Sequence, residues 1–462
     1  MPEQVTQPSR SPRRFLIWVC IFAFLLRVAV IFAAGSGRLT DASDDYFGFG
    51  WEMGRVALSL VQGHGFSSPL PLPTGPTAMV GPVYPLLIAA AFKIFGTYSI
   101  PAAIAIRILQ SCFATLTCFL LYLCGRDTVG DFAGRLAAIA WAIFPLNIFF
   151  TVNRIWETSL TGLLAVLLFW GLLKARNTAS FSSWILAGAL LGFAALVNTS
   201  LVVLAIPFGF SCLGRHRLRT VLPIAAGIIS CAIVVSPWIA RNYIRFAKPM
   251  LRSNFALEFR VGNNTLSYGQ KVEALHPSNV PAINRHWQQI GEMRFMEEKR
   301  AENSEFLHQH FGDFLFDTCN RMVNYWTGAW IRTVPDSPNL WSVIVPTSLL
   351  TFFGFLGVWQ MLRDRLAAAS IFAGCLGVYP IVYYLTTAQP RFYHTVTPFL
   401  ILSASYWVAH RFSRNAVPAS EAPNAPGPRK DLAGSLAARM TAPKPGRNVK
   451  NPYRSRSAQE SA

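Results

Sequence analysis

The sequence predicts an all-α integral-membrane protein, a bundle of about ten transmembrane helices with one interfacial helix and an outward-facing loop region. Three observations predict this fold class. Of the 462 residues, 52% are hydrophobic and only 14% are charged, whereas soluble domains carry about 25% charged residues. Ten apolar runs approach the roughly 20 residues that cross a bilayer. Lys and Arg gather in alternate connections between these runs, as the positive-inside rule requires.

The ten runs leave one shorter apolar stretch, residues 82–96, to be placed. If this stretch does not cross the membrane, both termini and every short basic connection lie on one side. If it does cross, the later basic connections face outward and break the rule. We therefore expect 82–96 to form a re-entrant or interfacial helix. The predicted membrane-crossing runs are 15–34, 101–124, 135–152, 158–175, 182–197, 201–214, 220–240, 339–362, 366–386 and 395–411.

The charge pattern also predicts the domain boundaries and the side of the membrane on which each segment lies. Residues 1–14 read as a basic cytoplasmic N-terminus, 15–411 as the transmembrane domain, and 412–462 as a disordered basic cytoplasmic tail. Two long segments then face outward, 35–81 and the polar 244–337, which we expect to be partly helical around 285–330. We expect a multi-pass inner-membrane protein with both termini in the cytoplasm.

The formal charge of +19 does not predict a nucleic-acid partner. Nine basic residues against three acidic ones lie in the tail, and most of the remaining excess lies in the short cytoplasmic connections. A basic tail gains roughly 1 kcal/mol per Lys or Arg beside an anionic leaflet. Membrane lipid is therefore the expected partner of this charge.

The outward face collects carboxylates and arginines. The predicted helix from Trp51 to Leu60 follows an acidic stretch, and each of these residues also has a purely structural interpretation. Asp44 and Asp45 could cap that helix, the pairs Glu52–Arg55 and Arg154–Glu157 could be ion pairs, and the arginines could anchor helix ends. Arg27 lies inside an apolar run, where an arginine is costly and usually faces the bundle interior. An ionic partner such as Glu52 or an anionic head group would explain its position. The candidate residues are Asp44, Asp45, Glu52, Arg27, Arg154, Glu157, Arg241, Arg391 and His394.

Several kinds of chemistry leave no trace in the sequence. There is no HExxH or CxxC metal motif and no GxGxxG or Walker A nucleotide motif. We expect no cofactor, and a divalent cation is the one addition left open. Carboxylates suit a general base and arginines suit a phosphate leaving group. The set therefore favours group transfer from a lipid-linked phosphate donor at the outward membrane face.

Five stretches follow one another over residues 41–403. After the acidic first loop come VALSLVQGHGFSSP, GPVYPLLIAAAFKIFG, FPLNIFFTVNRIWETSL, SPWIARNYIRF with RSNFALEFRVGNN, and PRFYHTVTPFLIL. In this order the stretches resemble the GT-C glycosyltransferases of glycosyltransferase family 39, which include protein O-mannosyltransferases and lipid A aminoarabinose transferases.

The resemblance implies a polyprenyl-phosphate-linked sugar as donor and an outward-facing glycan, lipid or protein as acceptor. It implies a catalytic acid at Asp44 or Asp45, with Glu52 as the rival position. Glu157 matches a second acidic position, and Arg391 a phosphate contact. Arg241, Asn254, Asn263 and Asn264 fall in the RNY and GNN motifs.

Two other classes of function stay open at this stage. A transporter or flippase of lipid-linked sugars would use similar lipid contacts, although the sequence shows no matching halves and its charges gather at one face. A membrane scaffold would use 244–337 to bind a partner and would not need the first-loop acids.

Overall fold

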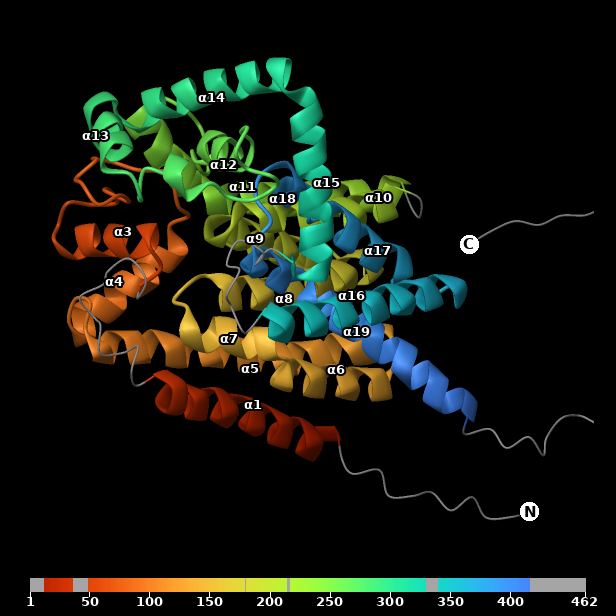
Figure 1. Cartoon of the computed structure of the whole chain (residues 1–462). Helices are drawn as coiled ribbons and strands as arrows, with labels where there is room; N and C mark the ends of the chain where they lie inside the picture. Colours follow the sequence, from red (N-terminus) through yellow and green to blue (C-terminus); the bar gives the residue numbers. More distant parts are fainter. Residues whose placement is uncertain (1–11, 36–48, 179, 214–216, 330–339, 416–462) are drawn as a thin grey trace, which may run out of the picture. The chain divides into compact units, whose positions relative to one another are not determined.

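The computed structural model describes residues 12–35, 49–178, 180–213, 217–329 and 340–415 (Figure 1). Within these ranges the chain forms helices and one isolated β-bridge, between Ser67 and Pro76. The predicted all-α fold class is therefore confirmed. One compact unit ends at Phe412 and holds everything discussed below. Nearly all of the predicted tail lies outside the described residues.

Each of the ten predicted runs coincides with a helix or with two consecutive helices. Judged by length and apolarity, five helices among the described residues could each cross a membrane, and a sixth span results if one bent pair is counted as a unit. The number of ten crossings stays a prediction. The helices are α1 (Pro12–Gly35), α5 (Ile100–Thr128), α6 (Asp131–Ile143), α7 (Pro145–Asn153), α8 (Thr158–Thr178), α9 (Phe181–Val197), η1 (Thr199–Leu204), α10 (Ala205–Leu213), α11 (Arg217–Phe246), α16 (Leu340–Arg363), α17 (Ala369–Val378), α18 (Ile381–Leu385) and α19 (Pro390–Asn415).

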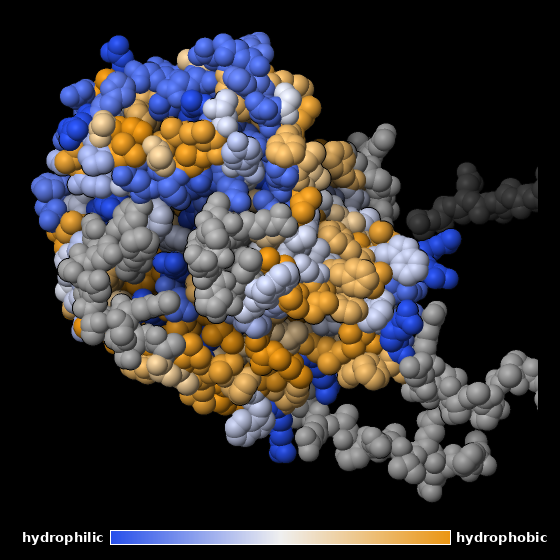
Figure 2. Space-filling view, viewed as in Figure 1, coloured by the Kyte–Doolittle hydropathy of each residue, from blue (hydrophilic) through white to orange (hydrophobic). Residues whose placement is uncertain are grey.

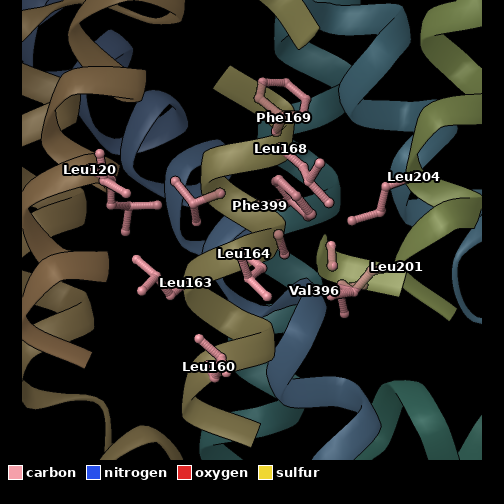
Figure 3. Close-up of a cluster of buried hydrophobic side chains, with 14 of the residues drawn as sticks. Leu120, Leu160, Leu163, Leu164, Leu168, Phe169, Leu201, Leu204, Val396 and Phe399 are labelled. Carbon is pink, nitrogen blue, oxygen red and sulfur yellow. The ribbon is translucent and has the colours of Figure 1, made fainter. Parts of the chain in front are cut away.

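Helix α8 lies at the centre of the bundle. It is apolar on all sides, as expected of a helix with neighbours all round, and most of its apolar span is buried. Figure 3 shows its leucines facing Leu120 of α5, Leu201 and Leu204 of η1, and Val396 and Phe399 of α19. Close packing at this centre fixes α19, and with it the residues at its start.

The α9–α11 pair depends on a glycine. A Cβ at Gly188 would lie 1.9 Å from the carbonyl oxygen of Gly227, so only glycine allows the two backbones to come this close. Small residues at helix crossings are typical of membrane bundles, where van der Waals packing replaces the hydrophobic effect between helices.

Helices α6 and α7 form the bent pair, with an angle of 47° between them. Pro145 at the start of α7 has no N–H to continue the ladder from α6. The carbonyls of Trp141 and Ala142 at the end of α6 are met by the guanidinium of Arg27, at 3.3 and 3.1 Å. Arg27 also donates to the carbonyl of Ala23 at 2.9 Å. The fully buried Arg27 thus donates hydrogen bonds to the carbonyls that the helix break leaves without backbone partners.

The two short helices at one end of the bundle are α3 (Glu52–Val61) and α4 (Val83–Phe95). At 1.5 Å per residue, the 13 residues of α4 extend about 20 Å, less than the roughly 30 Å hydrocarbon core. The expected short helix at 82–96 is therefore confirmed as a helix, and its interfacial placement stays a prediction.

A helical cap lies above the same end of the bundle, and it confirms the helical stretch expected around 285–330. A second small core around Trp287 and Phe295 holds it together. Buried Glu292 ties the cap to the loop after α3, since it accepts hydrogen bonds from Thr77 Oγ1 and Ala78 N and from Ser253 Oγ. The cap elements are α12 (Phe255–Gly262), η2 (Glu273–Leu275), α13 (Pro281–Ile290), α14 (Glu292–Gln309) and α15 (Phe311–Thr327).

The two ends of the bundle differ in their surfaces. Figure 2 shows hydrophilic residues over α13 and α14 and hydrophobic residues along the long helices. At the opposite end, Arg135 lies over the ring of Phe15 at the start of α1, and Trp170 near the end of α8 donates to Asp127 near the end of α5. The start of α6, with Arg135, and the end of α8, with Lys174 over the ring of Trp170, thus lie away from the cap.

Candidate functional site

Three cavities meet below the cap, and Arg391 lines all of them. We name them the acidic cavity, of about 400 Å³, the tryptophan cavity, of about 320 Å³, and the apolar cavity, of about 590 Å³. Glu52 and Glu258 also line both of the first two. Trp156 lines the second and the third.

The acidic cavity brings together residues from α3, the α7–α8 connection, η1, α12 and α18. Three carboxylates line it, those of Glu52, Glu157 and Glu258, against the two guanidiniums of Arg252 and Arg391. Its remaining polar lining consists of Asn198, Thr199, Ser200, Asn254, Tyr383, Thr386 and Thr387. Such a lining offers many hydrogen-bond partners to a ligand rich in hydroxyls.

The tryptophan cavity lies between Trp51 and Trp156 and the cap segment 269–276. The two indole rings contact at a centroid distance of 6.3 Å and an angle of 55°, so they form a corner. The Lys271 ammonium lies 5.4 Å from the centre of the Trp51 ring and pairs with Glu273 at 3.2 Å. Gln270, His276, Asn324 and Gln389 complete its polar lining.

The apolar cavity lies between α7 and the first turns of α16. Phe144, Phe149 and Phe150 face Val343 and Pro346. At one end the cavity reaches Arg154, Trp156 and Arg391. A hydrocarbon chain would fit the aromatic and aliphatic walls, and an anionic group at the end of that chain would meet the two arginines.

Arg391 stands where α19 begins, directly after Pro390. Its guanidinium carbon lies 4.8 Å from the ring centres of both Trp156 and Phe392. No hydrogen bond or ion pair to another described residue involves this guanidinium, and its Nε is buried without a partner. The aromatic rings hold it in place while its donors stay available to a ligand.

Glu52 opens α3, and backbone geometry puts it there. Gly50 has φ +79°, and a Cβ on it would lie 2.4 Å from the carbonyl oxygen of Ile155. Trp51 follows at φ 58°. This conformation costs a bulky residue about 1–3 kcal/mol, and residues that adopt it are frequent at functional sites. This tight approach brings Glu52 and Glu157 to one cavity.

The partners of Glu52 come from the cap. Ser278 Oγ donates to Glu52 Oε1 at 3.0 Å, and His276 Nε2 lies 3.9 Å from the same oxygen. The backbone N–H of Ser278 donates to His276 Nδ1, so the neutral ring carries its proton on Nε2, facing Glu52. Burial, together with the cationic Lys271, lowers the pKa of His276 to about 3. His276 is therefore a neutral donor at ordinary pH.

Glu157 has one weak partner. Asn198 Nδ2 lies 3.5 Å from its Oε1, while Oε2 is buried with no partner among the described residues. The ion pairs considered from the sequence, Glu52–Arg55 and Arg154–Glu157, do not form, because the contacts of both glutamates go elsewhere.

The structure separates the remaining predicted site residues into two groups. Glu52, Arg154, Glu157, Asn254 and Arg391 line the cavities. Arg27, Arg241, Asn263, Asn264 and His394 do not belong to the lining of the three cavities. Asp44 and Asp45 lie outside the described residues.

Arg241 and the two asparagines of the GNN motif hold main-chain segments. Arg241 donates to the carbonyls of Thr77 and Phe66, both at 2.7 Å. Asn263 donates to the carbonyl of Leu385 and accepts from Arg321. Asn264 closes a turn by accepting from Leu266 N.

Two predicted residues lie inside the bundle. Arg27 was expected to meet Glu52 or a head group, and it binds helix carbonyls instead. His394 is buried against Trp141 and Phe150, and both of its ring nitrogens lack a partner among the described residues.

Sequence reasoning missed the cap residues that complete the site: His276, Lys271 and Glu258. They lie in a long polar segment where only the fold selects them. Pro277 was the one local hint, because a proline biases the residue before it, here His276, toward extended backbone. Among the described residues, no group of three His, Cys, Asp or Glu side chains is arranged to hold a metal ion.

The fold and the site together define a polytopic membrane protein with an apolar cavity that borders two arginines and two polar cavities. Comparison with known proteins agrees with this class. A model of the family described as dolichyl-phosphate-mannose-protein mannosyltransferase matches residues 79–240. A comparison with curated protein sequences found no match.

Solved structures with the same fold include the oligosaccharyltransferase AglB of the archaeon Archaeoglobus fulgidus. In complex with an inhibitory peptide and a dolichol-phosphate, it matches with a TM-score of 0.55 and 16% identity, over 88% of this chain and 51% of AglB. An oligosaccharyltransferase of Archaeoglobus fulgidus in the apo form matches with a TM-score of 0.52 and 14% identity, over 88% of this chain and 51% of that chain. The chain thus spans about half the length of AglB.

A looser likeness links the chain to ArnT of Cupriavidus metallidurans bound to undecaprenyl phosphate, with a TM-score of 0.47 and 13% identity over 83% of this chain and 60% of ArnT. The AglB matches confirm, at the level of the fold, the resemblance to GT-C glycosyltransferases drawn from the sequence.

Proposed function

We propose that the chain is a membrane glycosyltransferase that moves a sugar from a polyprenyl-phosphate carrier to an outward-facing acceptor. One observation carries the proposal: Arg391, free of hydrogen bonds to described residues, lies where the apolar cavity meets the acidic cavity. The family model and the AglB structure with dolichol-phosphate support a lipid phosphate as the ligand.

The cavities suggest how the donor lies. The polyprenyl chain occupies the apolar cavity between α7 and α16, and its phosphate meets Arg391 and Arg154. The sugar then extends into the acidic cavity, where Glu157 and Asn198 hydrogen-bond its hydroxyls. Arginine suits the phosphate because its planar fork donates two hydrogen bonds at once.

The reaction breaks the bond between the sugar C1 and the phosphate oxygen and forms a bond from C1 to the acceptor oxygen. The acceptor proton passes to a carboxylate, and polyprenyl phosphate leaves with the electron pair of the broken bond. Arginines that meet the developing phosphate charge stabilise the transition state. Attack from the side opposite the phosphate inverts the configuration at C1.

The base is proposed among three acids. Glu52 is favoured among the described residues because it borders both polar cavities and takes hydrogen bonds on one oxygen only. Asp44 and Asp45, the positions implied by the family resemblance, precede Glu52 by seven or eight residues and stay proposed as bases.

The proposed location is the inner membrane, with both termini in the cytoplasm and the three cavities on the outer face. The membrane-protein character rests on the apolar helices and the GT-C fold. The positions of the basic connections, away from the cap, support the orientation.

The arginines supply the positive charge that the leaving phosphate needs, so the proposal invokes no cofactor. A divalent cation would add to this charge, and activity measured with and without EDTA separates the two cases.

A transfer assay tests the proposal. Full-length protein in lipid nanodiscs receives undecaprenyl-phosphate carrying one radiolabelled sugar at a time, with an extract of the cell envelope as acceptor. We expect water-soluble label with at least one sugar, and loss of that label in Glu52→Gln or in Asp44→Asn or Asp45→Asn. Full activity in all three variants contradicts the mechanism. Movement of intact labelled lipid between the leaflets of sealed vesicles that contain the protein, without sugar transfer, supports a flippase instead.

A further inference from the structure

We propose that the tryptophan cavity is the acceptor site and that it takes an uncharged glycan. The inference rests on the proposed function and specifies its acceptor, which neither the family model nor the AglB likeness settles.

The position of the tryptophan cavity is the first step. Glu52, Glu258 and Arg391 line both polar cavities. A donor sugar that fills the acidic cavity therefore leaves the tryptophan cavity as the space from which a hydroxyl can approach both Glu52 and the phosphate end. A general base must lie within hydrogen-bond reach of the proton it takes, and Glu52 meets this condition for a ligand in either cavity.

The chemistry of the lining selects the class of acceptor. A sugar ring has an apolar face of C–H groups and a rim of hydroxyls. Trp51 and Trp156 offer two large aromatic faces, and around them Gln270, His276 and Asn324 offer hydrogen-bond donors and acceptors. Aromatic faces beside amides and carboxylates suit a carbohydrate better than a hydrocarbon or a metal ion.

The charges of the cavity favour an uncharged ligand. Among the described residues that line it, the carboxylates are Glu52, Glu258 and Glu273 and the cations are Lys271 and Arg391, while His276 is neutral. One negative charge is in excess, and Arg391 is already committed to the donor phosphate. A phosphorylated or carboxylated acceptor would meet repulsion here, whereas a neutral glycan would not.

A peptide acceptor fits less well. Extended peptides commonly bind by adding to the edge of a sheet, and the described residues contain no strand for them to join. The cavity of about 320 Å³ lies at the small end of the range for ligand pockets. It would hold a terminal sugar more readily than a chain segment.

The backbone around Trp51 adds an independent sign of function. Trp51 holds a positive φ of 58° and follows Gly50 at φ 79°. A bulky residue in this region is strained, and such strain persists where the surrounding structure over-determines it, often at ligand sites. The strained turn presents the Trp51 ring to the cavity beside Trp156.

The test follows the label in the transfer assay. After reaction, the product is digested with a broad protease, and label is measured in the polysaccharide and in released peptides. We expect protease-resistant label. Label in peptides, with transfer intact, overturns the glycan inference and leaves the glycosyltransferase standing. Absence of any transfer contradicts the proposed function itself.

Variants then test the site. Trp51→Ala and Trp156→Ala should each raise the acceptor KM about tenfold, since loss of one aromatic contact is worth roughly one power of ten in affinity. The donor KM should hold in Trp51→Ala, because of the three cavities Trp51 lines the tryptophan cavity alone. Trp51→Phe should retain most of the affinity that Trp51→Ala loses, which separates stacking from a folding defect. Trp18→Ala, in an exposed position on α1, is the matched control and should leave both constants unchanged. An unchanged acceptor KM in Trp156→Ala and Trp51→Ala overturns the inference.

Discussion

Replacing Arg391 by Gln should cost activity and spare stability. The side chain contributes little to the fold, because within the described part of the chain its guanidinium makes only two contacts, the cation–π contacts to Trp156 and Phe392. Such contacts are worth about 0.5–1 kcal/mol each at accessible sites. The folded state should therefore lose no more than about 2 kcal/mol.

The effect on the reaction should be larger. A hydrogen bond to a charged group contributes roughly 1.5–3 kcal/mol, and the fork of Arg391 offers two such bonds to the phosphate. Loss of one preorganised donor to a developing negative charge commonly reduces kcat by about 10²–10³-fold. We expect Arg391→Gln to lose about that factor, and Arg391→Lys to recover only part of it, since the ammonium keeps the charge and lacks the fork.

The assay combines transfer kinetics with thermal unfolding of the protein in nanodiscs. Arg241→Gln is the matched control, because Arg241 holds the carbonyls of Thr77 and Phe66. Leaving these carbonyls unpaired costs about 1–3 kcal/mol each, so this variant should lower Tm clearly. The reasoning is refuted if Arg391→Gln keeps wild-type kcat, or if Arg391→Gln and Arg241→Gln lose Tm equally.

Three further predictions concern the other parts of the site. Val343→Trp fills the apolar cavity and should raise the KM for long polyprenyl donors more than the KM for short-chain analogues. Val345→Trp, on an exposed face of the same helix, should not produce this difference. Equal effects of Val343→Trp on both chain lengths would contradict the lipid assignment. The pKa of His276 is about 3 in the folded state and about 6.5 in the unfolded chain. At pH 5 the unfolded chain therefore binds more protons than the folded one. The free energy of unfolding should fall by about 2 kcal/mol between pH 7 and pH 5. That share of the fall should vanish in His276→Gln, and an unchanged Tm–pH slope in the variant would disprove it. Glu157→Gln should raise the donor KM about tenfold with little change in Tm, because the carboxylate has one long contact with the described residues. A large drop in Tm with unchanged KM would make Glu157 structural.

Much of the fold could be predicted from the sequence because its strongest determinants are local. Apolar runs of spanning length, prolines such as Pro145, and the basic connections all act within a few residues of one another. The helix breaks were harder to predict. Residues 201–214 read as one run, yet Asn198 caps a 3-10 turn that opens this segment.

The site was only partly predictable because similar local patterns have different tertiary outcomes. Arg241 and Arg391 both stand at the outer edge of an apolar run, and nothing nearby in the sequence distinguishes them. The fold turns Arg241 toward main-chain carbonyls and leaves Arg391 facing three cavities. Arg27 shows the same limit, since its partners are carbonyls freed by a helix break more than 110 residues away.

His276 could not be identified from the sequence at all. It lies in a polar segment and acquires its neutral state by burial in the folded cap, beside a glutamate 224 residues earlier in the chain. Long-range convergence of this kind carries no periodic signal that a sequence pattern could reveal.

The most direct test of the account is a cryo-electron microscopy structure of the full-length protein in nanodiscs containing undecaprenyl phosphate. The account predicts density for the phosphate within hydrogen-bond distance of the Arg391 guanidinium and for the isoprenoid chain between α7 and α16. Phosphate density beside Arg241, or a lipid bound with the apolar cavity empty, would contradict it.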